Sequence, residues 1–206
     1  DLVILDIMMP VMDGLEFTEQ LKTGTATSHI PVIMLTAKNL EEHRAEGYEH
    51  EADSYITKPF HSKVLLARIE NLLKQRKLLK KLFQGSQVAE QEIAESHLED
   101  RDKQFLKQLH AIIQQNLSDS EFSVEDIGKQ IGLSRVQLYR KVKAMTGSSV
   151  VDLLRKARLV KAKRLLETRS MSVSEVAYDV GFSAPSYFTK CFKEEYGILP
   201  GDVGNN

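Results

Sequence analysis

Several residue types are scarce in this sequence, and each shortage excludes a class of protein. Cys191 is the single cysteine among 206 residues, which excludes an internal disulfide framework and a cysteine-rich zinc site. The chain has no tryptophan, and no apolar run approaches the ~18 residues of a membrane span. Its first residues also lack the basic flank of a signal peptide. We therefore expect a cytoplasmic protein of one domain or two small ones.

The net charge of −1 conceals an uneven distribution. Residues 84–120 carry 3 basic and 7 acidic side chains, whereas residues 129–169 carry 12 basic and 2 acidic ones. Such a basic concentration is typical of a surface that binds a polyanion, although a solvated helix face would give the same count.

Three short apolar segments near the start of the chain are typical of buried parallel strands. They are followed or separated by helical patterns, so that the order is strand Leu2–Leu5, helix Leu15–Leu21, strand Pro31–Leu35, helix Leu40–His50 and strand Ser54–Ile56. This alternation predicts parallel pairing, in which the carboxyl ends of the strands share one edge. Asp6, Thr36 and Lys58 follow the three segments and are expected to converge there.

A carboxylate, a hydroxyl and an ammonium at one sheet edge suit phosphoryl chemistry. Asp6 can act as a nucleophile, while Thr36 and Lys58 can hold phosphoryl oxygens and a divalent ion would offset the charge. The alternative is structural: Asp6 would cap a turn, Thr36 would end a strand and Lys58 would be a surface charge.

The motifs DLVILDIMMPVMDG, VIMLTA and SYITKPF resemble the receiver domain of two-component response regulators. Thr36 lies 30 residues after Asp6, and Lys58 lies 22 residues after Thr36. The resemblance implies that Asp6 is the phosphoacceptor, Thr36 the switch hydroxyl and Lys58 the family's lysine, with a cis peptide at Pro59. It also implies that the Tyr55 side chain moves with Thr36.

The resemblance covers only part of a receiver. A full receiver has five strands in the order 2-1-3-4-5, and this sequence matches from the third strand onward. The acidic pair that helps to bind Mg²⁺ in this family follows the first strand, so Asp6 and the backbone carbonyl of Met8 are the family-type metal ligands here. We expect Mg²⁺ in an intact receiver but not in this chain, and an exposed edge on the first matched strand.

The connector after the receiver segment has the pattern of a long helix. Between Val64 and Phe83, a heptad-like seam is formed by Leu65, Ile69, Leu72, Leu79 and Phe83. We expect an extended helix that also contacts a partner; the alternative is a single receiver helix packed on its sheet through Leu66, Ile69 and Leu73. Residues 84–102 are interpreted as a linker, because 84–86 are typical of a break and 87–102 are acidic with few large apolar residues.

The last hundred residues contain an internal repeat, with Ser123–Leu133 and Ser172–Phe182 49 residues apart. Each copy has a capping box, a glycine in its turn, a serine before its second helix and a glycine after it. These residues are Ser123 with Asp126, Gly132, Ser134 and Gly147 in the first copy, and Ser172 with Glu175, Gly181, Ser183 and Gly197 in the second. The pattern predicts two helix-turn-helix units.

The second helix of such a unit enters the major groove of DNA. Leu138, Val142 and Met145 are expected to face inward in the first copy, and Phe188 and Phe192 in the second. The outward, DNA-contacting residues are then Arg135, Gln137, Tyr139, Arg140 and Lys143, and Ser186, Thr189, Lys190 and Lys193. Arginine and glutamine can read bases, whereas phosphate contact is the more cautious role for the lysines. The alternative for each residue is a solvated polar position.

Two further features complete the pattern. A basic helix over Val150–Thr168 would act as a rigid spacer between the two reading helices. Cys191 lies among aromatic residues and is interpreted as a small core residue, with a redox switch as the alternative.

The segments VEDIGKQIGLSRVQLYRKVKAMTG and VSEVAYDVGFSAPSYFTKCFKEEYG, with LLRKARLVKAKRLL between them, resemble the AraC-family DNA-binding domain. The fold class expected is thus α/β plus all-α: a partial doubly wound receiver with its last three strands, then a helical domain with two helix-turn-helix motifs. The expected boundaries are 1–83 for the receiver and its extended helix, 84–102 for the linker and 103–206 for the DNA-binding domain.

A receiver joined to an AraC-type domain resembles the C-terminal output of hybrid two-component systems, whose parent protein is in some cases membrane-tethered. The resemblance implies a transcription regulator, not an enzyme. Its implied partners are double-stranded DNA, a second copy of the chain, an upstream histidine kinase as phosphodonor, and RNA polymerase. Two other functions stay open at this point: a phosphoryl-transfer or phosphatase enzyme at Asp6, and a structural dimerisation module.

Overall fold

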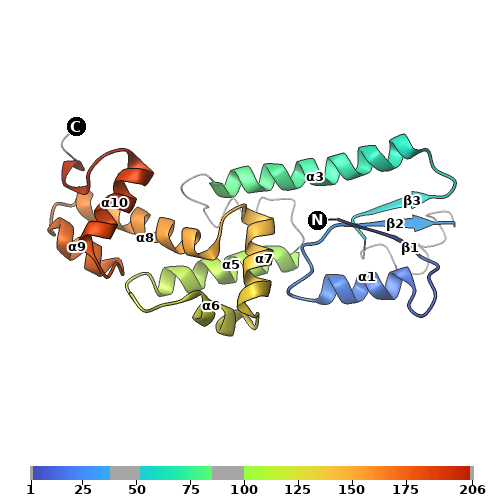
Figure 1. The fold of residues 1–206 in the computed structure, drawn as a ribbon, viewed down its shortest axis with the longest axis horizontal. Coiled ribbons are helices and arrows are strands. Elements are labelled where there is room, and N and C mark those ends of the chain that lie inside the picture. Colours follow the sequence, from blue (N-terminus) through green and yellow to red (C-terminus); the bar gives the residue numbers. More distant parts are fainter. Residues whose placement is uncertain (1, 38–51, 85–99, 205–206) are drawn as a thin grey trace.

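The computed structural model describes residues 2–37, 52–84 and 100–204, which form an α/β unit followed by a helical unit (Figure 1). The described part of the α/β unit has a parallel sheet of β1 (Val3–Asp6), β2 (Val32–Thr36) and β3 (Ser54–Thr57), in the order β1-β2-β3. The three predicted strands are confirmed. The helix predicted over 40–50 lies outside the described residues.

Two helices lie on opposite faces of this sheet, α1 (Gly14–Thr23) and α3 (Ser62–Gln84) (Figure 1). Leu5, Val32 and Met34 form the buried centre of the unit. Helix α1 begins where Asp13 accepts a hydrogen bond from the Glu16 amide, 2.8 Å away. Gly14 must be glycine, because a Cβ there would fall on the carbonyl oxygen of Asp6.

The connector helix is continuous, as predicted. Its contacts differ from those of the alternative, in which a single receiver helix packs on its sheet. Leu66 and Leu73 are 56% and 37% exposed, so they do not pack on the sheet. Leu65, Ile69 and Leu72 of the seam are half-buried, and α3 contacts helix α7 of the same chain. The side chains of Leu79 and Phe83 lie outside the described residues. Within the described residues β1 pairs with β2 alone, and Ile4 on β1 is 41% exposed.

The helical unit consists of six α-helices and a short 3-10 helix within residues 100–204. These are α5 (Asp100–Gln115), α6 (Val124–Ile131), α7 (Arg135–Thr146), α8 (Val150–Glu167), α9 (Val173–Asp179), α10 (Pro185–Tyr196) and η1 (Pro200–Asp202). Most of the predicted linker, 84–102, lies outside the described residues. Its last three residues are part of α5, in which Asp102 is buried.

Two separate hydrophobic cores share one helix. Val150 and Leu154, on the first half of α8, belong to the core formed with α5, α6 and α7. Leu159, Ala162 and Leu166, on the second half, belong to the core formed with α9 and α10. The predicted spacer is therefore a structural part of both helix-turn-helix units, which it holds apart along the long axis of the molecule (Figure 1).

Most of the predicted caps are confirmed. Ser123 and Ser172 form capping boxes with Asp126 and Glu175, and Gly132, Gly147 and Gly197 adopt the left-handed conformation after their helices. The predicted N-cap Ser183 is wrong, because α10 begins at Pro185 and Ala184 occupies the cap position without a side-chain hydrogen bond. Proline at the first helical position forces the residue before it into extended backbone, so the cap shifts by one residue.

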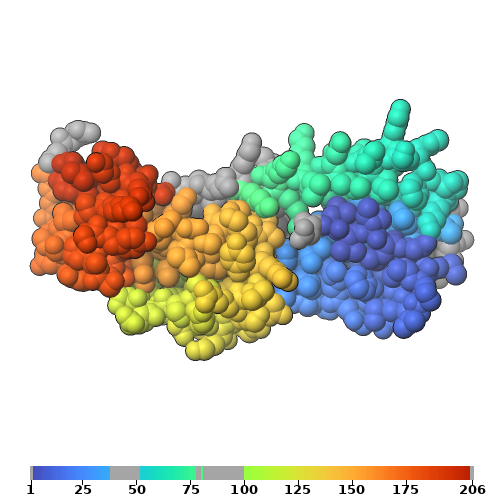
Figure 2. Space-filling model, in the orientation of Figure 1, coloured from blue at the N-terminus to red at the C-terminus, as the bar shows by residue number. Residues whose placement is uncertain are grey.

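The two units of the chain are in contact. Figure 2 shows the α7 region of the helical unit against the blue part of the α/β unit, within residues 2–37. No helix among the described residues is long and apolar enough to cross a membrane.

Candidate nucleic-acid interface and receiver site

The predicted convergence of side chains at the sheet edge is present. Asp6 ends β1, Thr36 ends β2 and Lys58 follows β3, and the Lys58 ammonium donates to a carboxylate oxygen of Asp6. The other carboxylate oxygen accepts from the Met8 amide at 3.3 Å. The hydrogen bond from Lys58 is the main reason that the pKa of Asp6 lies below its ordinary value. Asp6 is therefore an accessible, ionised carboxylate at neutral pH, as a nucleophile must be.

The remaining receiver-type residues lie around this pair. The backbone amide of Lys58 donates to the Thr36 carbonyl at 2.6 Å, which joins β2 and β3 beyond their paired residues. The predicted cis peptide joins Lys58 and Pro59. Thr36 is buried, whereas Tyr55 is half-buried on β3. The structure brings Asp6 and Lys58 into contact and places Thr36 on the neighbouring strand end.

The described residues do not fit a complete magnesium site. Mg²⁺ takes octahedral oxygen ligands, usually one or two carboxylates with other oxygens and water. Here the Asp6 carboxylate is already paired with a cation, and the described residues contain no group of three acidic, histidine or cysteine side chains suited to a metal. The backbone of Met8 would add one oxygen, which leaves the donor set short.

Helix α7 has one fully buried side and one exposed side. Leu138 and Val142 are completely buried and Met145 is 8% exposed, so the predicted inward stripe is confirmed. The predicted outward residues of this copy are all exposed: Arg135, Gln137, Tyr139, Arg140 and Lys143. The reading helix is held by two glycines in the left-handed conformation, Gly132 before it and Gly147 after it.

Several of these exposed residues already have partners within the chain. Gln137 completes an unpredicted capping box, because its side-chain oxygen accepts from the Ser134 amide at 3.0 Å. Bidentate adenine recognition would use this same oxygen, which the cap holds against the Ser134 backbone in this conformation. Arg135 is paired with Glu125 at 2.7 Å, and Lys143 donates to the Gly147 carbonyl at 2.8 Å.

Helix α10 repeats this arrangement around an aromatic core. Phe188 and Phe192 are completely buried, as predicted, and their ring centroids lie 5.6 Å apart. Ser186, Lys190 and Lys193 are exposed. Thr189 is half-buried and its hydroxyl donates to the Pro185 carbonyl at 2.9 Å. Cys191 is 4% exposed, which confirms the core interpretation.

The basic residues of α8 bind mostly to the protein itself. Lys156 lies 3.8 Å from Glu195, and Lys161 lies 2.9 Å from Asp179. Arg158 donates to the carbonyl oxygens of Leu117 and Asp119. The basic side chains concentrated in this part of the sequence therefore have two roles. Some of them bind the two helix-turn-helix units to α8, and others remain exposed on α7.

Sequence reasoning missed Lys141. This lysine lies on α7, three residues after Leu138 and four before Met145, and its side chain is 1% exposed. The spacing was a usable signal, because a lysine within an apolar helical stripe requires buried acceptors. Those acceptors come from distant parts of the chain, which the spacing alone does not identify.

Comparison with known families gives two separate matches, one within each unit of the chain. Residues 1–70 match the model of the response regulator receiver domain, and residues 127–206 match that of a helix-turn-helix domain. The two matches together indicate a DNA-binding regulator.

Individual relatives match over different lengths. A protein named histidine kinase P4 from Formosa agariphila is 37% identical over 205 residues, which cover 99% of this chain and 15% of that protein. The phosphate regulon transcriptional regulatory protein PhoB of Escherichia coli is 48% identical over 75 residues, covering 36% of this chain and 33% of PhoB. The chain thus spans a third or less of these two relatives.

Among solved structures, the C-terminal domain of AraT, a response regulator from Geobacillus stearothermophilus, is 29% identical. It has a TM-score of 0.48 and covers 53% of this chain and 88% of its own. By the two family matches, residues 1–70 contain response regulator receiver sequence and residues 127–206 contain a helix-turn-helix domain.

Proposed function

We propose that this chain is the receiver and DNA-reading part of a two-component transcription regulator. The observation that supports this most is the duplication of the helix-turn-helix unit. In each copy the second helix buries one side in a core and exposes basic residues on the other. A phosphoryl-transfer enzyme or a pure dimerisation module would leave that duplication without a use.

We infer that the two reading helices contribute unequally to base recognition. Arg140 is exposed at the middle of α7, where an arginine can donate two hydrogen bonds to guanine. The other predicted contacts of α7 are weaker candidates for bases, since Gln137 is used as a cap and Lys143 binds a backbone carbonyl. On α10, Lys190 is 4.0 Å from Glu194 in an exposed pair, which a DNA phosphate can replace at little cost.

Control by phosphorylation belongs to the same proposal. In the intact receiver, Asp6 would accept the phosphoryl group with Mg²⁺ bound, and Thr36, Tyr55 and Lys58 would respond to it. An upstream histidine kinase would supply the phosphoryl group, and a second copy of the chain and RNA polymerase would be further partners. The pairing of Asp6 with Lys58 supports the assignment of the site.

The direct test is DNA binding by an Arg140→Ala variant. A duplex selected from a random pool should bind the chain, and the substitution should weaken binding to it by ~1–3 kcal/mol if Arg140 contacts guanine. Fluorescence anisotropy with labelled duplex and excess competitor DNA measures this loss.

Lys129→Ala is the matched control, because it also removes one positive charge but from α6, where the side chain is 78% exposed. It should leave the preference for the selected duplex unchanged. If Arg140→Ala and Lys129→Ala behave alike, the proposed reading face of α7 is wrong. A chain that selects no duplex at all would contradict the proposed function.

A further inference from the structure

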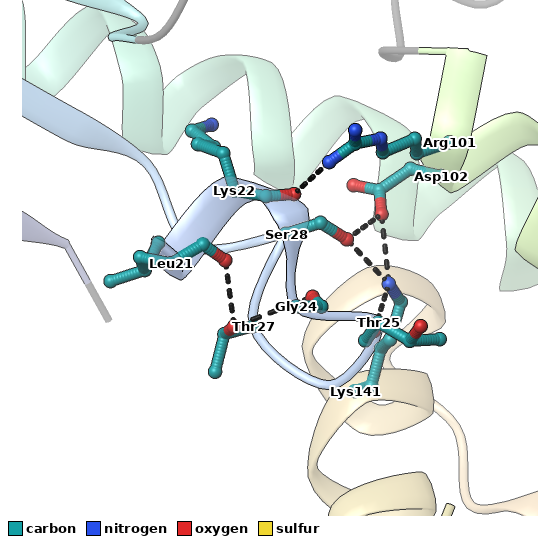
Figure 3. Close-up of polar contacts among 9 residues, drawn as sticks. All are labelled: Leu21, Lys22, Gly24, Thr25, Thr27, Ser28, Arg101, Asp102 and Lys141. Atoms are coloured by element: carbon teal, nitrogen blue, oxygen red, sulfur yellow. Dashed lines mark hydrogen bonds and ion pairs between the residues drawn. The ribbon is translucent and has the colours of Figure 1, made fainter. Parts of the chain in front are cut away.

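A lysine is buried on the reading helix itself. The ammonium of Lys141 donates to the Thr25 carbonyl and the Ser28 hydroxyl, each 2.7 Å away, and to the Asp102 carboxylate at 3.0 Å (Figure 3). It also lies 4.5 Å from the centre of the Phe105 ring. A lysine ammonium has three protons, so every one has an acceptor in this arrangement.

These acceptors belong to both units of the chain. Asp102 is on α5 of the helical unit, whereas Thr25 and Ser28 lie in the loop between α1 and β2 of the receiver. The Ser28 hydroxyl donates to the same Asp102 oxygen at 2.9 Å, which closes the network. Beside it, Arg101 donates to the Lys22 carbonyl at 2.9 Å. Directional hydrogen bonds, and not apolar contact alone, thus hold the receiver loop against the helical unit.

The docked loop lies at the opposite end of β2 from the phosphoacceptor site. Residues 24–31 precede β2, and Thr36 ends it beside the strand end that carries Asp6. At about 3.3 Å per residue, a five-residue strand separates the two places by roughly 15 Å. The loop therefore touches the reading helix without covering Asp6.

Docking occupies a flank of α7 that DNA would also require. An α-helix with its side chains is about 10–12 Å wide and the major groove is about 12 Å wide, so sugar-phosphate backbones flank an inserted helix on both sides. Lys141 lies one helical turn after the exposed Gln137, at the border between the buried and exposed sides of α7. The receiver loop takes up space at this border through its contact with Lys141, and helix α3 also contacts α7.

We propose that residues 24–31 are a docking surface for the reading helix α7 and that Lys141 is the residue of α7 that holds this surface in place. Docking then competes with insertion of α7 into DNA. The proposal rests on the DNA-reading function proposed above. In the docked state one cation of α7 is buried and neutralised by Asp102. Release exposes that ammonium beside the reading residues, where DNA phosphates approach. By thermodynamic linkage, DNA binding and receiver docking oppose each other equally.

A Ser28→Arg variant tests the contact of Lys141 by changing the receiver loop. The side chain of Ser28 is buried at the joint, so arginine adds bulk and a second cation beside Lys141. The fold of the loop should persist, because the Ser28 amide still donates to the Gly24 carbonyl. We expect the full chain to bind its selected duplex roughly tenfold more tightly, as follows if about a tenth of the molecules are undocked beforehand. Thr23→Arg adds the same charge at a nearby exposed position and should change the affinity less than twofold.

Amide hydrogen exchange provides a second readout that does not depend on the affinity. Segment 24–31 should be protected in the free chain, and it should lose protection in Ser28→Arg and in the wild-type chain bound to DNA. Equal or weaker duplex binding by Ser28→Arg would overturn the proposal, as would protection of this segment that persists in the DNA complex. Failure of both proteins to bind any duplex would instead contradict the DNA-reading function, while exchange in the free chains would still report on docking.

Discussion

At the scale of single residues, His29 is the clearest source of pH dependence. It is part of the receiver loop, its side chain is buried, and its Nδ1 atom has no hydrogen-bond partner among the described residues. Burial, followed by the nearby positive charges of Lys141 and Arg76, lowers its pKa to about 4. The folded protein therefore keeps this imidazole neutral at a pH where the unfolded chain protonates it.

The stability of the protein should accordingly fall in mild acid. The unfolded chain binds more protons than the folded one between pH 6.5 and about 4, so the contribution of His29 is complete above pH 6.5 and is lost as the pH falls through this range. The largest loss is of order 3 kcal/mol. Urea unfolding at pH 7.5 and pH 5 should show a smaller difference in His29→Leu than in the wild-type chain. His61→Gln removes an exposed imidazole as the control, and an identical effect of both substitutions would contradict the role of His29.

At the scale of elements, the two helices of the second repeat begin with different caps, and the difference is measurable. Ser172 accepts a hydrogen bond from the Glu175 amide at 3.3 Å, and Glu175 in turn accepts from the Ser172 amide at 2.7 Å. Ser183 occupies the corresponding place before α10 in the sequence but is not the cap. We expect Ser172→Ala to lower the free energy of unfolding by ~1 kcal/mol and Ser183→Ala to change it by less than about 0.5 kcal/mol.

Chemical denaturation of the two variants compares them under the same conditions. Equal losses would mean that Ser183 stabilises α10 in a way that the observed cap geometry does not include. The pKa of Glu175 lies below its ordinary value because of the hydrogen bond from the Ser172 backbone amide. The contribution of Glu175 to this capping box is therefore expected to be present at neutral pH and to decrease in acid as Glu175 is protonated.

At the scale of the whole molecule, α8 sets the distance between the two reading helices. Its 18 residues span about 27 Å, and its two halves are buried in different cores, so it cannot bend freely between the units. Successive major-groove faces on one side of DNA lie ~34 Å apart. The chain should therefore bind two base elements at one fixed spacing.

Inserting base pairs between these two elements tests the rigidity. An insertion of about half a helical turn should reduce affinity to that of a single element, and an insertion of a whole turn should not restore it, because α8 cannot lengthen. Anisotropy titrations with a series of such duplexes measure the dependence on spacing. Undiminished binding across the series would show that only one unit reads bases, or that the units move independently.

Local features of this protein were determined by the sequence alone. Capping boxes, left-handed glycines and the inward stripe of α7 depend on residues a few positions apart, so pairs such as Ser123 with Asp126 or Leu138 with Val142 are recognisable from their spacing. The meeting of Asp6 and Lys58 was also predictable, because parallel strands bring their carboxyl ends to one edge. The displaced cap at Ala184 shows where a neighbouring proline overrides such a local pattern.

Only the tertiary structure decided how the two units meet. The helical pattern of α3 indicated an apolar face but did not identify α7 as what it contacts. Lys141 stood in an apolar stripe, yet its acceptors Ser28 and Thr25 are 113 and 116 residues away. A buried ammonium is stable only when such acceptors surround it, and their positions follow from the packing of the whole chain. The link between receiver and reading helix is for this reason a property of the folded molecule and not of any one segment.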